Sequence, residues 1–476
     1  MPDSTDPVTL PAPQHSPTPR ELDDLELLSN GALAPLTGFE GPGGLITLHV
    51  PGDVGEAAIR AGALELVDPE GVPLAAVSVE STYDPDDGSA GLVGIVGEVV
   101  PTAHNEFGAF RRLYLSPAEV RTRYGDSVVT VPVSSPLTVD DLQRISDQAD
   151  ERTVLLLALV GHSAGRACRD HPAGRACRDH PAGRACRDHP AGRACRDHPA
   201  GRACRDHSPV GLIRATLAAA RALPDAHVVA VPLASRGDAS LDHDLGERVV
   251  SAYAPGEVVA VTGEGELPDD VAAIVDFDRP DRPRQGLVLF FTGLSGSGKS
   301  TLARALHDVI LERGERTVTS LDGDVVRRNL SAGLTFSKQD RETNIRRIGW
   351  VAAEISRHGG VAICSPIAPF DSTRRQVRVM VEAAGGALLL IHVATPLEEC
   401  ERRDRKGLYA KARRGEIPEF TGISSPYEAP TDAAVRVDTT GRSIEDALGQ
   451  ILRVLYDDGY LSTPAVEPVE TRGVQK

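Results

Sequence analysis

The chain has 476 residues, which is more than one hydrophobic core usually holds, so two or three domains are expected. A hydrophobic fraction of 41% is enough for buried cores, whereas a formal net charge of −17 disfavours a general binder of nucleic acids or membranes. The polar, Pro-rich start carries no apolar signal segment, and no apolar run is long enough to span a membrane. We therefore expect a cytoplasmic protein that binds neither nucleic acids nor membranes.

The first half of the chain is expected to contain many short strands. Residues 1–20 are rich in Pro, Ser, Thr and Asp, a composition that is typical of a disordered arm. In residues 21–139, short apolar runs are separated by Gly, Pro and Asp, which predicts a small β-rich domain. Residues 140–280 combine helical patterns with buried-strand patterns, and therefore favour an α/β segment.

A nonapeptide, Ala-Gly-Arg-Ala-Cys-Arg-Asp-His-Pro, is repeated in tandem between residues 164 and 208. Each copy contains a Cys-x-x-His pair, so one hypothesis is an array of sites for a soft metal ion. We favour a duplicated, solvated loop inserted into the domain, because Gly and Pro in every copy leave little structure to hold rigid metal ligands. The remaining cysteines, Cys364 and Cys400, are expected to be small core residues, and no disulfide is expected.

The stretch Gly293-Leu-Ser-Gly-Ser-Gly-Lys-Ser-Thr301 fits the phosphate-binding pattern G-x-x-x-x-G-K-[ST]. A strand pattern at 287–291 precedes it and a helical pattern follows, which disfavours the alternative of a simple Gly/Ser turn. Glycines let backbone N–H groups approach phosphates, Lys299 adds a charge, and the hydroxyl of Ser300 can complete a Mg²⁺ shell. The expected nucleotide contacts are Gly293, Ser295, Gly296, Ser297, Gly298, Lys299, Ser300 and Thr301.

From residue 285 on, strand and helix patterns alternate as in a doubly wound parallel sheet. A strand pattern at 316–321 ends at Asp322, and such sheets bind ligands at the carboxyl ends of their strands. Asp322 is the candidate to orient Mg²⁺ or to accept a proton from an attacking hydroxyl, with an acidic turn as the alternative. A basic cluster suits an anionic acceptor, although a solvated helix face explains some of its members. The cluster consists of Arg327, Arg328, Arg341, Arg346 and Arg347.

Residues 400–430 form a long, basic segment with several Gly and Pro residues after a central strand pattern. Such a segment can close over bound nucleotides as a lid, and the alternative is a surface excursion without that role.

Several separated signatures in this half of the chain resemble adenylylsulfate kinase. They are Gly293–Thr301, Leu321–Asp324, Phe336-Ser337 with Asp340–Ile345, Lys406–Tyr409 and Phe420–Pro430. The resemblance implies a P-loop kinase domain at residues 285–462, followed by a disordered tail at 463–476. It also implies a role in sulfate assimilation: the γ-phosphate of ATP, with Mg²⁺, would be transferred to the 3′-hydroxyl of adenosine 5′-phosphosulfate.

The resemblance also assigns roles to individual residues. Asp322 and Lys299 would be the catalytic residues. Ser300 and Asp322 would bind Mg²⁺, and Arg402 would add a nucleotide contact. The implied acceptor contacts are Arg327, Phe336, Arg341, Asn344, Ile367, Lys406 and Phe420. Phe336 would stack on the adenine, whereas Lys406 and Phe420 would belong to the lid. Many relatives have Ser-Pro-Tyr/Phe-Arg where this chain has Ala368-Pro-Phe-Asp371, which removes a hydroxyl group and a positive charge.

The first half resembles the front of an ATP sulfurylase at Leu28-Ser-Asn-Gly-Ala-Leu-Ala-Pro-Leu-Thr-Gly-Phe39. That family's Arg-Asn-Pro and spaced histidines do not follow Val160, where the chain enters the repeat. We therefore expect a degenerate half without full activity, with a sulfurylase-like β-rich domain at 21–139 and a truncated α/β segment at 140–280. A bifunctional sulfurylase and kinase, and a nucleotide-dependent scaffold, are the alternatives. A homo-oligomer and a separate sulfurylase partner are left open.

Overall fold

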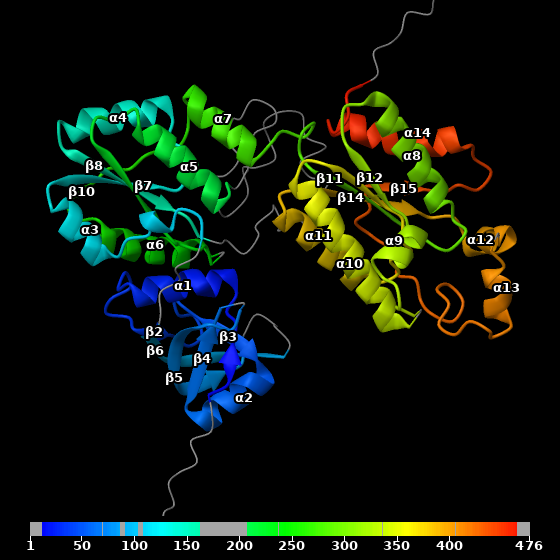
Figure 1. Ribbon diagram of the computed structural model, residues 1–476, viewed down its shortest axis with the longest axis horizontal. Coiled ribbons are helices and arrows are strands. Elements are labelled where there is room, and N and C mark those ends of the chain that lie inside the picture. Colours follow the sequence, from blue (N-terminus) through cyan, green and yellow to red (C-terminus); the bar gives the residue numbers. More distant parts are fainter. Residues whose placement is uncertain are drawn as a thin grey trace, which may run out of the picture. The chain divides into compact units, whose positions relative to one another are not determined.

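The computed structural model describes residues 12–68, 70–85, 91–102, 108–161, 207–236, 238–335, 337–404 and 406–463. The described residues fall into two compact units, one that ends at Asp278 and one that begins at Arg279 (Figure 1). Nearly all of the nonapeptide repeat, and the metal hypothesis with it, lies outside the described residues. Among the helices of the described part, none has the length and apolar character that a membrane crossing needs.

The first unit begins with a mainly antiparallel six-stranded sheet. Its path is β1-β4-β5-β6-β2, and β3 also pairs with β6. The strands are β1 (Gln14–His15), β2 (Gly38–Phe39), β3 (Leu48–Pro51), β4 (Ala63–Val67), β5 (Pro73–Tyr83) and β6 (Leu92–Pro101), with helices α1 (Pro19–Ser29) and α2 (Gly52–Ala61). The expectation of a disordered arm is wrong from residue 12 on. The hydroxyl of Thr18 caps α1 in a reciprocal arrangement with Glu21, and β1 pairs with β4.

The same unit continues with a four-stranded parallel sheet in the order β10-β7-β8-β9. Its strands are β7 (Val128–Val133), β8 (Thr153–Leu159), β9 (Ala226–Val231) and β10 (Glu257–Val258). Its helices are the 3₁₀ turn η1 (Arg111–Leu113), α3 (Pro117–Tyr124), α4 (Val139–Ala149), α5 (Pro209–Ala220), α6 (Ala239–Tyr253) and α7 (Asp269–Asp278). The placement of β7 in the β-rich domain is therefore wrong. Its residues are buried on both faces, as in a parallel sheet, and it pairs with β8.

A buried ion pair joins the two sheets of the first unit. Arg236, which follows β9, donates to the carboxylate of Asp24 in α1 and to the carbonyl oxygen of Leu45, at 2.9 Å in the latter case. Both charged side chains are buried. Apolar residues of α1, α6, β8 and β9 also belong to one continuous hydrophobic core. The pair therefore holds α1 against the end of β9.

We expect Arg236→Met to lower the free energy of unfolding by about 3–5 kcal/mol near pH 8, because it leaves the Asp24 carboxylate buried without its cation. Burial raises the pKa of Asp24 to about 7, although Arg236 acts in the opposite direction. A raised pKa in the folded state favours the protonated form, so the loss should shrink near pH 5, where Asp24 becomes neutral. Urea unfolding followed by far-UV circular dichroism measures both values.

The control for this change is Arg152→Met. Arg152 pairs with Glu257 at 3.0 Å, and both side chains are exposed, so a change of at most about 1 kcal/mol is expected. Equal effects of the two substitutions would contradict the structural role assigned to the buried pair.

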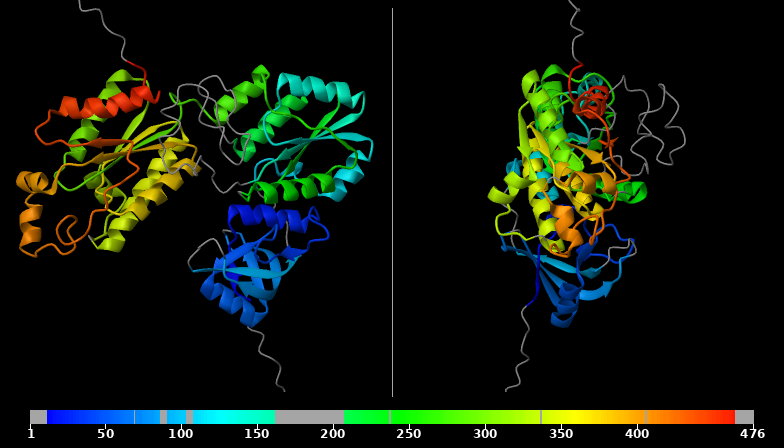
Figure 2. Two further views of the ribbon diagram at one scale, coloured as in Figure 1. Left: turned by 180° about the vertical axis from the view of Figure 1, so that it is seen from behind. Right: turned by 90° about the vertical axis from the view of Figure 1, so that its right-hand side faces the viewer.

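The second unit is a five-stranded parallel sheet between two layers of helices. The strand order is β12-β13-β11-β14-β15. The strands are β11 (Leu287–Thr292), β12 (Val318–Leu321), β13 (Val361–Cys364), β14 (Ala387–Val393) and β15 (Val435–Val437). Helices α8 (Lys299–Arg313) and α14 (Ile444–Asp457) cover one face, and α10 (Lys338–Arg357) and α11 (Asp371–Ala383) cover the other (Figure 2). The short helices are α9 (Gly323–Asn329), α12 (Leu397–Arg403) and α13 (Leu408–Arg413). The predicted doubly wound α/β fold is confirmed.

Candidate active site

The carboxyl ends of β11, β13 and β12 lie side by side at one edge of the second unit's sheet, because these strands are parallel neighbours. Gly293 follows β11, Asp322 follows β12 and Ser365 follows β13. The Ser365 hydroxyl donates to Oδ2 of Asp322 at 3.2 Å. This edge is where open parallel sheets bind ligands. The phosphate loop and the candidate acid predicted from the sequence therefore meet at one place.

Three glycines determine the path of the phosphate loop. Gly293, Gly296 and Gly298 have φ angles of 147°, 75° and 101°, a region that favours glycine. A Cβ on Gly293 would lie 2.4 Å from the carbonyl oxygen of Val393, and one on Gly296 would lie 3.0 Å from that of Cys400. Glycine is therefore needed at these positions for both conformation and space.

Neighbouring segments hold the carbonyl groups of this loop. The hydroxyl groups of Thr395 and Thr439 lie 3.0 and 2.9 Å from the carbonyl oxygen of Ser297. The hydroxyl group of Tyr409 donates to the carbonyl oxygen of Ser295 at 2.8 Å. The hydroxyl oxygen of Ser297 is buried and has no hydrogen-bond partner within the described ranges. Such an unsatisfied buried group fits a loop that binds an oxygen-rich ligand.

Lys299 is the first residue of α8, and its side chain is buried. Its Nζ donates to the carbonyl oxygen of Leu294 at 2.6 Å. Burial lowers the pKa of Lys299 to about 8, and the positive charge of Lys406 acts in the same direction. Ser300 and Thr301 are exposed at the N-terminal end of the same helix, where the helix dipole attracts anions. The predicted nucleotide contacts from Gly293 to Thr301 thus lie together, in the phosphate loop and at the start of α8.

Arg341 and Asn344 lie one turn apart on α10. Arg341 donates from Nη1 to the hydroxyl oxygen of Thr421 at 2.8 Å and from Nη2 to that of Ser425 at 3.3 Å. Nε of Arg341 and Oδ1 of Asn344 are buried, and neither has a hydrogen-bond partner in the described part of the chain. Arg341 and Asn344, both predicted to contact the acceptor substrate, therefore carry a hydrogen-bond donor and a hydrogen-bond acceptor that a ligand could use.

Phe370 is a residue of this region that sequence reasoning missed. It is buried, and its ring centroid lies 4.9 Å from Nζ of Lys338 and 5.7 Å from Cζ of Arg341. Contacts of cations with an aromatic face hold the cationic groups in place. The available signal was an aromatic residue after a central strand, in the same chain half as the basic cluster.

The other predicted acceptor residues are less tightly grouped. Ile367 contributes its carbonyl oxygen, which accepts from the backbone N–H of Gly293 at 3.4 Å. Phe420 packs edge-on against Tyr409, with 5.1 Å between ring centroids. Arg327 lies on α9 and is half-buried, and Lys406 is exposed. Phe336 lies outside the described residues.

The two adjacent arginines of α12 differ in position. Arg402 is 73% exposed and pairs with Glu399 of the same helix. Arg403 reaches the phosphate-loop region, where its Nη1 lies 2.8 Å from Oγ1 of Thr439 and 3.5 Å from the carbonyl oxygen of Gly296. Sequence reasoning named Arg402 and missed Arg403, because the rotation of this short helix is set by its packing and not by a local pattern.

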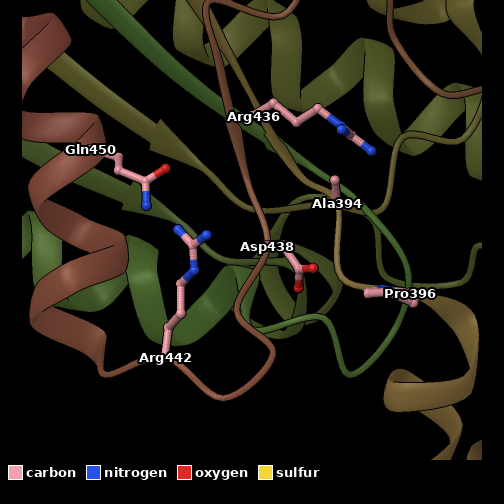
Figure 3. Close-up of a pocket in the computed structure, with 6 residues that line it drawn as sticks. All are labelled: Ala394, Pro396, Arg436, Asp438, Arg442 and Gln450. Atoms are coloured by element: carbon pink, nitrogen blue, oxygen red, sulfur yellow. The ribbon is translucent and has the colours of Figure 1, made fainter.

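A cavity of about 440 Å³ lies at the carboxyl ends of β14 and β15 (Figure 3). Its lining residues are Ala394, Pro396, Arg436, Asp438, Arg442 and Gln450. The cavity is next to the phosphate loop, because Thr395 and Thr439, which contact Ser297, are sequence neighbours of these lining residues. Arg346 and Arg347 of the predicted basic cluster line another cavity, of about 300 Å³, with Trp350 and Met380.

A family model described as adenylylsulphate kinase matches residues 285–438. The second unit therefore contains a region similar to the adenylylsulphate kinase family. The chain is also 46% identical over 191 residues to a sulfate adenylyltransferase of Emericella nidulans and 45% identical over 193 residues to one of Aspergillus terreus. Each match covers 40% of this chain and 33% or 34% of the relative. The chain thus spans about a third of the length of the curated relatives it matches.

Two solved structures of APS kinases are also similar. A hexameric APS kinase from Thiobacillus denitrificans covers 95% of both chains, with a TM-score of 0.63 and 26% identity. A Mycobacterium tuberculosis APS kinase in complex with AMPPNP and APS is 42% identical, over 36% of this chain and 99% of that chain, with a TM-score of 0.35. The first match extends over nearly the whole chain, so it includes the first unit as well as the second.

Proposed function

We propose that this protein is an adenylylsulfate kinase, which transfers the γ-phosphate of ATP to the 3′-hydroxyl of adenosine 5′-phosphosulfate. The observation that carries the proposal is that the phosphate loop and Asp322 lie at the same edge of the sheet, in a unit that matches the family model. The phosphate loop and Asp322 lie there with Ser365 between their strands. In-line transfer to a positioned hydroxyl needs alignment and neutralised charge, and little covalent chemistry from the protein.

ATP would place its phosphates along Gly293–Thr301, with Lys299 as the nearby charge. The cavity at the ends of β14 and β15 has room for the base and the ribose. Arg403 borders the same region through Thr439, and Arg402 would contribute from the exposed side of α12. The exposed hydroxyl of Ser300 and the carboxylate of Asp322 are oxygen ligands of the type that Mg²⁺ prefers. Mg²⁺ would neutralise charge on the transferred phosphoryl group.

The acceptor would bind on the α10 side of the same edge. Arg341 and Asn344 carry the unsatisfied polar atoms there, and adenosine 5′-phosphosulfate is a polar anion. Asp322 would accept the proton of the attacking hydroxyl or orient the metal. The other acceptor contacts that we propose are Arg327, Phe336, Ile367, Lys406 and Phe420.

The lowered pKa of Lys299 predicts proton uptake on nucleotide binding. Above about pH 8 the amine is largely neutral in the empty protein, whereas a bound phosphate would favour its charged form. Binding of Mg-ADP near pH 9 should therefore take up about one proton, and affinity should fall about tenfold per pH unit in that range. Calorimetry in two buffers of different ionisation enthalpy measures the uptake. Equal heats in both buffers near pH 9 would contradict the assigned role of Lys299.

The proposal is tested by ADP release from Mg-ATP with adenosine 5′-phosphosulfate, with AMP, and without an acceptor. We expect release that depends on the phosphosulfate and is weak with AMP, which lacks the sulfate. ATP consumption that is the same in all three mixtures would overturn the proposal.

A bifunctional enzyme is the second candidate, because the curated relatives are named sulfate adenylyltransferases. Since the chain matches only a third of their length, we propose that the first unit lacks full sulfurylase activity. Pyrophosphate release from ATP and sulfate tests this, and release far slower than that of a complete sulfurylase is expected.

The Thiobacillus protein is hexameric by its name. We propose a homo-oligomer here as well, together with a cytoplasmic location, and light scattering coupled to size-exclusion chromatography tests the oligomeric state.

A further inference from the structure

The loop Ser365–Phe370, between β13 and α11, has a strained backbone and is called the acceptor loop below. Ala368 is buried and has a φ of 44°. This is the left-handed region, which a residue with a Cβ adopts only at a cost in free energy. Such a conformation persists only where the surrounding structure holds it, and it is often found at functional sites. The groups that hold Ala368 therefore bear on function.

Three consecutive carbonyl groups of the acceptor loop accept hydrogen bonds from three different parts of the unit. The bonds are Thr292 Oγ1 to Ile367 O at 2.6 Å, Arg374 Nη1 to Ala368 O at 2.9 Å, and Glu428 N to Pro369 O at 2.9 Å. The donors come from β11, from α11 and, in the case of Glu428, from the segment between α13 and β15. The loop is thus fixed on both sides of its strained residue.

Arg374 is the charged side chain among these three donors, and burying its charge costs free energy. It is buried with 4% of its side chain exposed, and its Nε has no hydrogen-bond partner among the described residues. It lies in the first turn of α11, where the helix dipole disfavours a cation. Its Nη2 lies 3.2 Å from Oδ1 of Asp371, which also pairs with Arg375 at 2.6 Å. The guanidinium group of Arg374 thus contacts Ala368, within the acceptor loop, and Asp371, directly after it.

We propose that Arg374 is a positioning residue that holds the Ala368 peptide in its left-handed conformation and thereby places Ile367 for the acceptor. Asp371 neutralises the buried guanidinium, so the acidic residue at this position supports the loop. The acceptor loop also touches the nucleotide side, because the carbonyl oxygen of Ile367 accepts from the backbone N–H of Gly293 at 3.4 Å. This inference rests on the proposed kinase function.

The first test compares Arg374→Met with Arg378→Met. We expect Arg374→Met to raise the KM for adenosine 5′-phosphosulfate about 10- to 100-fold, since a charged hydrogen bond to the loop is lost. The KM for ATP should change less than about threefold. Arg378 is the matched control, one turn further along α11, with contacts to Leu388 at 3.3 Å and Asp432 at 3.0 Å. Arg378→Met should leave both constants within about twofold.

Arg374→Lys covers the case in which Arg374→Met does not fold. It keeps the charge but loses the planar fork, so a smaller rise in the same KM is expected. An unchanged KM for the acceptor in a folded variant would overturn the proposal.

The sharper test adds Ala368→Gly. Glycine adopts the left-handed conformation without a steric cost, so the loop should then depend less on Arg374. The acceptor KM of Ala368→Gly alone is the reference, and Arg374→Met should raise it much less in this background than in the wild type. Equal effects of Arg374→Met in both backgrounds would show that Arg374 does not act through the strained peptide.

A structural readout separates this proposal from the proposed function. A crystal structure of the Arg374→Met protein should show residue 368 outside the left-handed region or the acceptor loop displaced. An unchanged loop would overturn the role of Arg374. A wild-type protein without acceptor-dependent turnover would count against the kinase function, and the variant structure would still decide whether Arg374 holds the loop.

Discussion

Asp322→Asn is expected to lower kcat about 10²- to 10⁴-fold, which is the range for loss of a general base. Asparagine keeps the size of the side chain and can still accept the hydrogen bond from Ser365, which is 3.2 Å long in the wild type. What it loses is the negative charge that would accept the proton or orient Mg²⁺. The KM for ATP should change less than about threefold, because the phosphate loop is untouched. Steady-state ADP release measures both constants.

The control for this substitution is Asp308→Asn. Asp308 lies on α8 with 69% of its side chain exposed, and its loss should leave kcat within about twofold. If Asp322→Asn kept more than about a tenth of wild-type kcat, Asp322 would be a structural acid and another group would have to supply the base.

Lys299→Met is expected to lower kcat/KM for ATP about 10³-fold or more, because a charge aimed at the transferred phosphoryl group is removed. Unlike Asp322→Asn, it should also weaken binding of Mg-ADP, since Lys299 lies within the phosphate loop. The buried amine has a lowered pKa of about 8, which means that the charged form is disfavoured in the folded protein. Its removal at neutral pH should therefore leave the melting temperature unchanged or raise it.

Turnover, nucleotide binding and thermal unfolding of Lys299→Met are measured together, with Lys411→Met on the exposed face of α13 as the control. A fall in melting temperature that matches the loss of activity would contradict the account, because it would make Lys299 a stabilising residue. A variant with nearly normal Mg-ADP binding would place the phosphates elsewhere.

Much of the second unit could be predicted from the local sequence pattern. Its two central strands, β11 and β13, are fully buried runs, and its helices have apolar spacing, so the order and type of these elements follow from the sequence. Parallel strands place their carboxyl ends at one edge, which brings Asp322 to the phosphate loop once the fold is known. The adjacency of these two parts was therefore predictable.

Features set by packing between distant residues were not predictable. Arg236 and Asp24 are 212 positions apart, and nothing local marks them as a buried pair. The choice between Arg402 and Arg403 depends on how α12 packs beside Thr439. Ala368 is left-handed in a loop whose contacts come from residues distant in sequence, such as Thr292, so its local sequence gives no sign of this conformation.

The identity of the product decides whether this protein is an adenylylsulfate kinase. Purified protein is mixed with Mg-ATP and adenosine 5′-phosphosulfate, with Asp322→Asn alongside, and the products are identified by phosphorus NMR and mass spectrometry. We expect ADP together with a phosphosulfate that carries the new phosphate on its 3′-hydroxyl, and neither product with the variant beyond a trace. Measurable ATP binding without acceptor-dependent ADP would contradict the kinase function and favour a nucleotide-dependent scaffold.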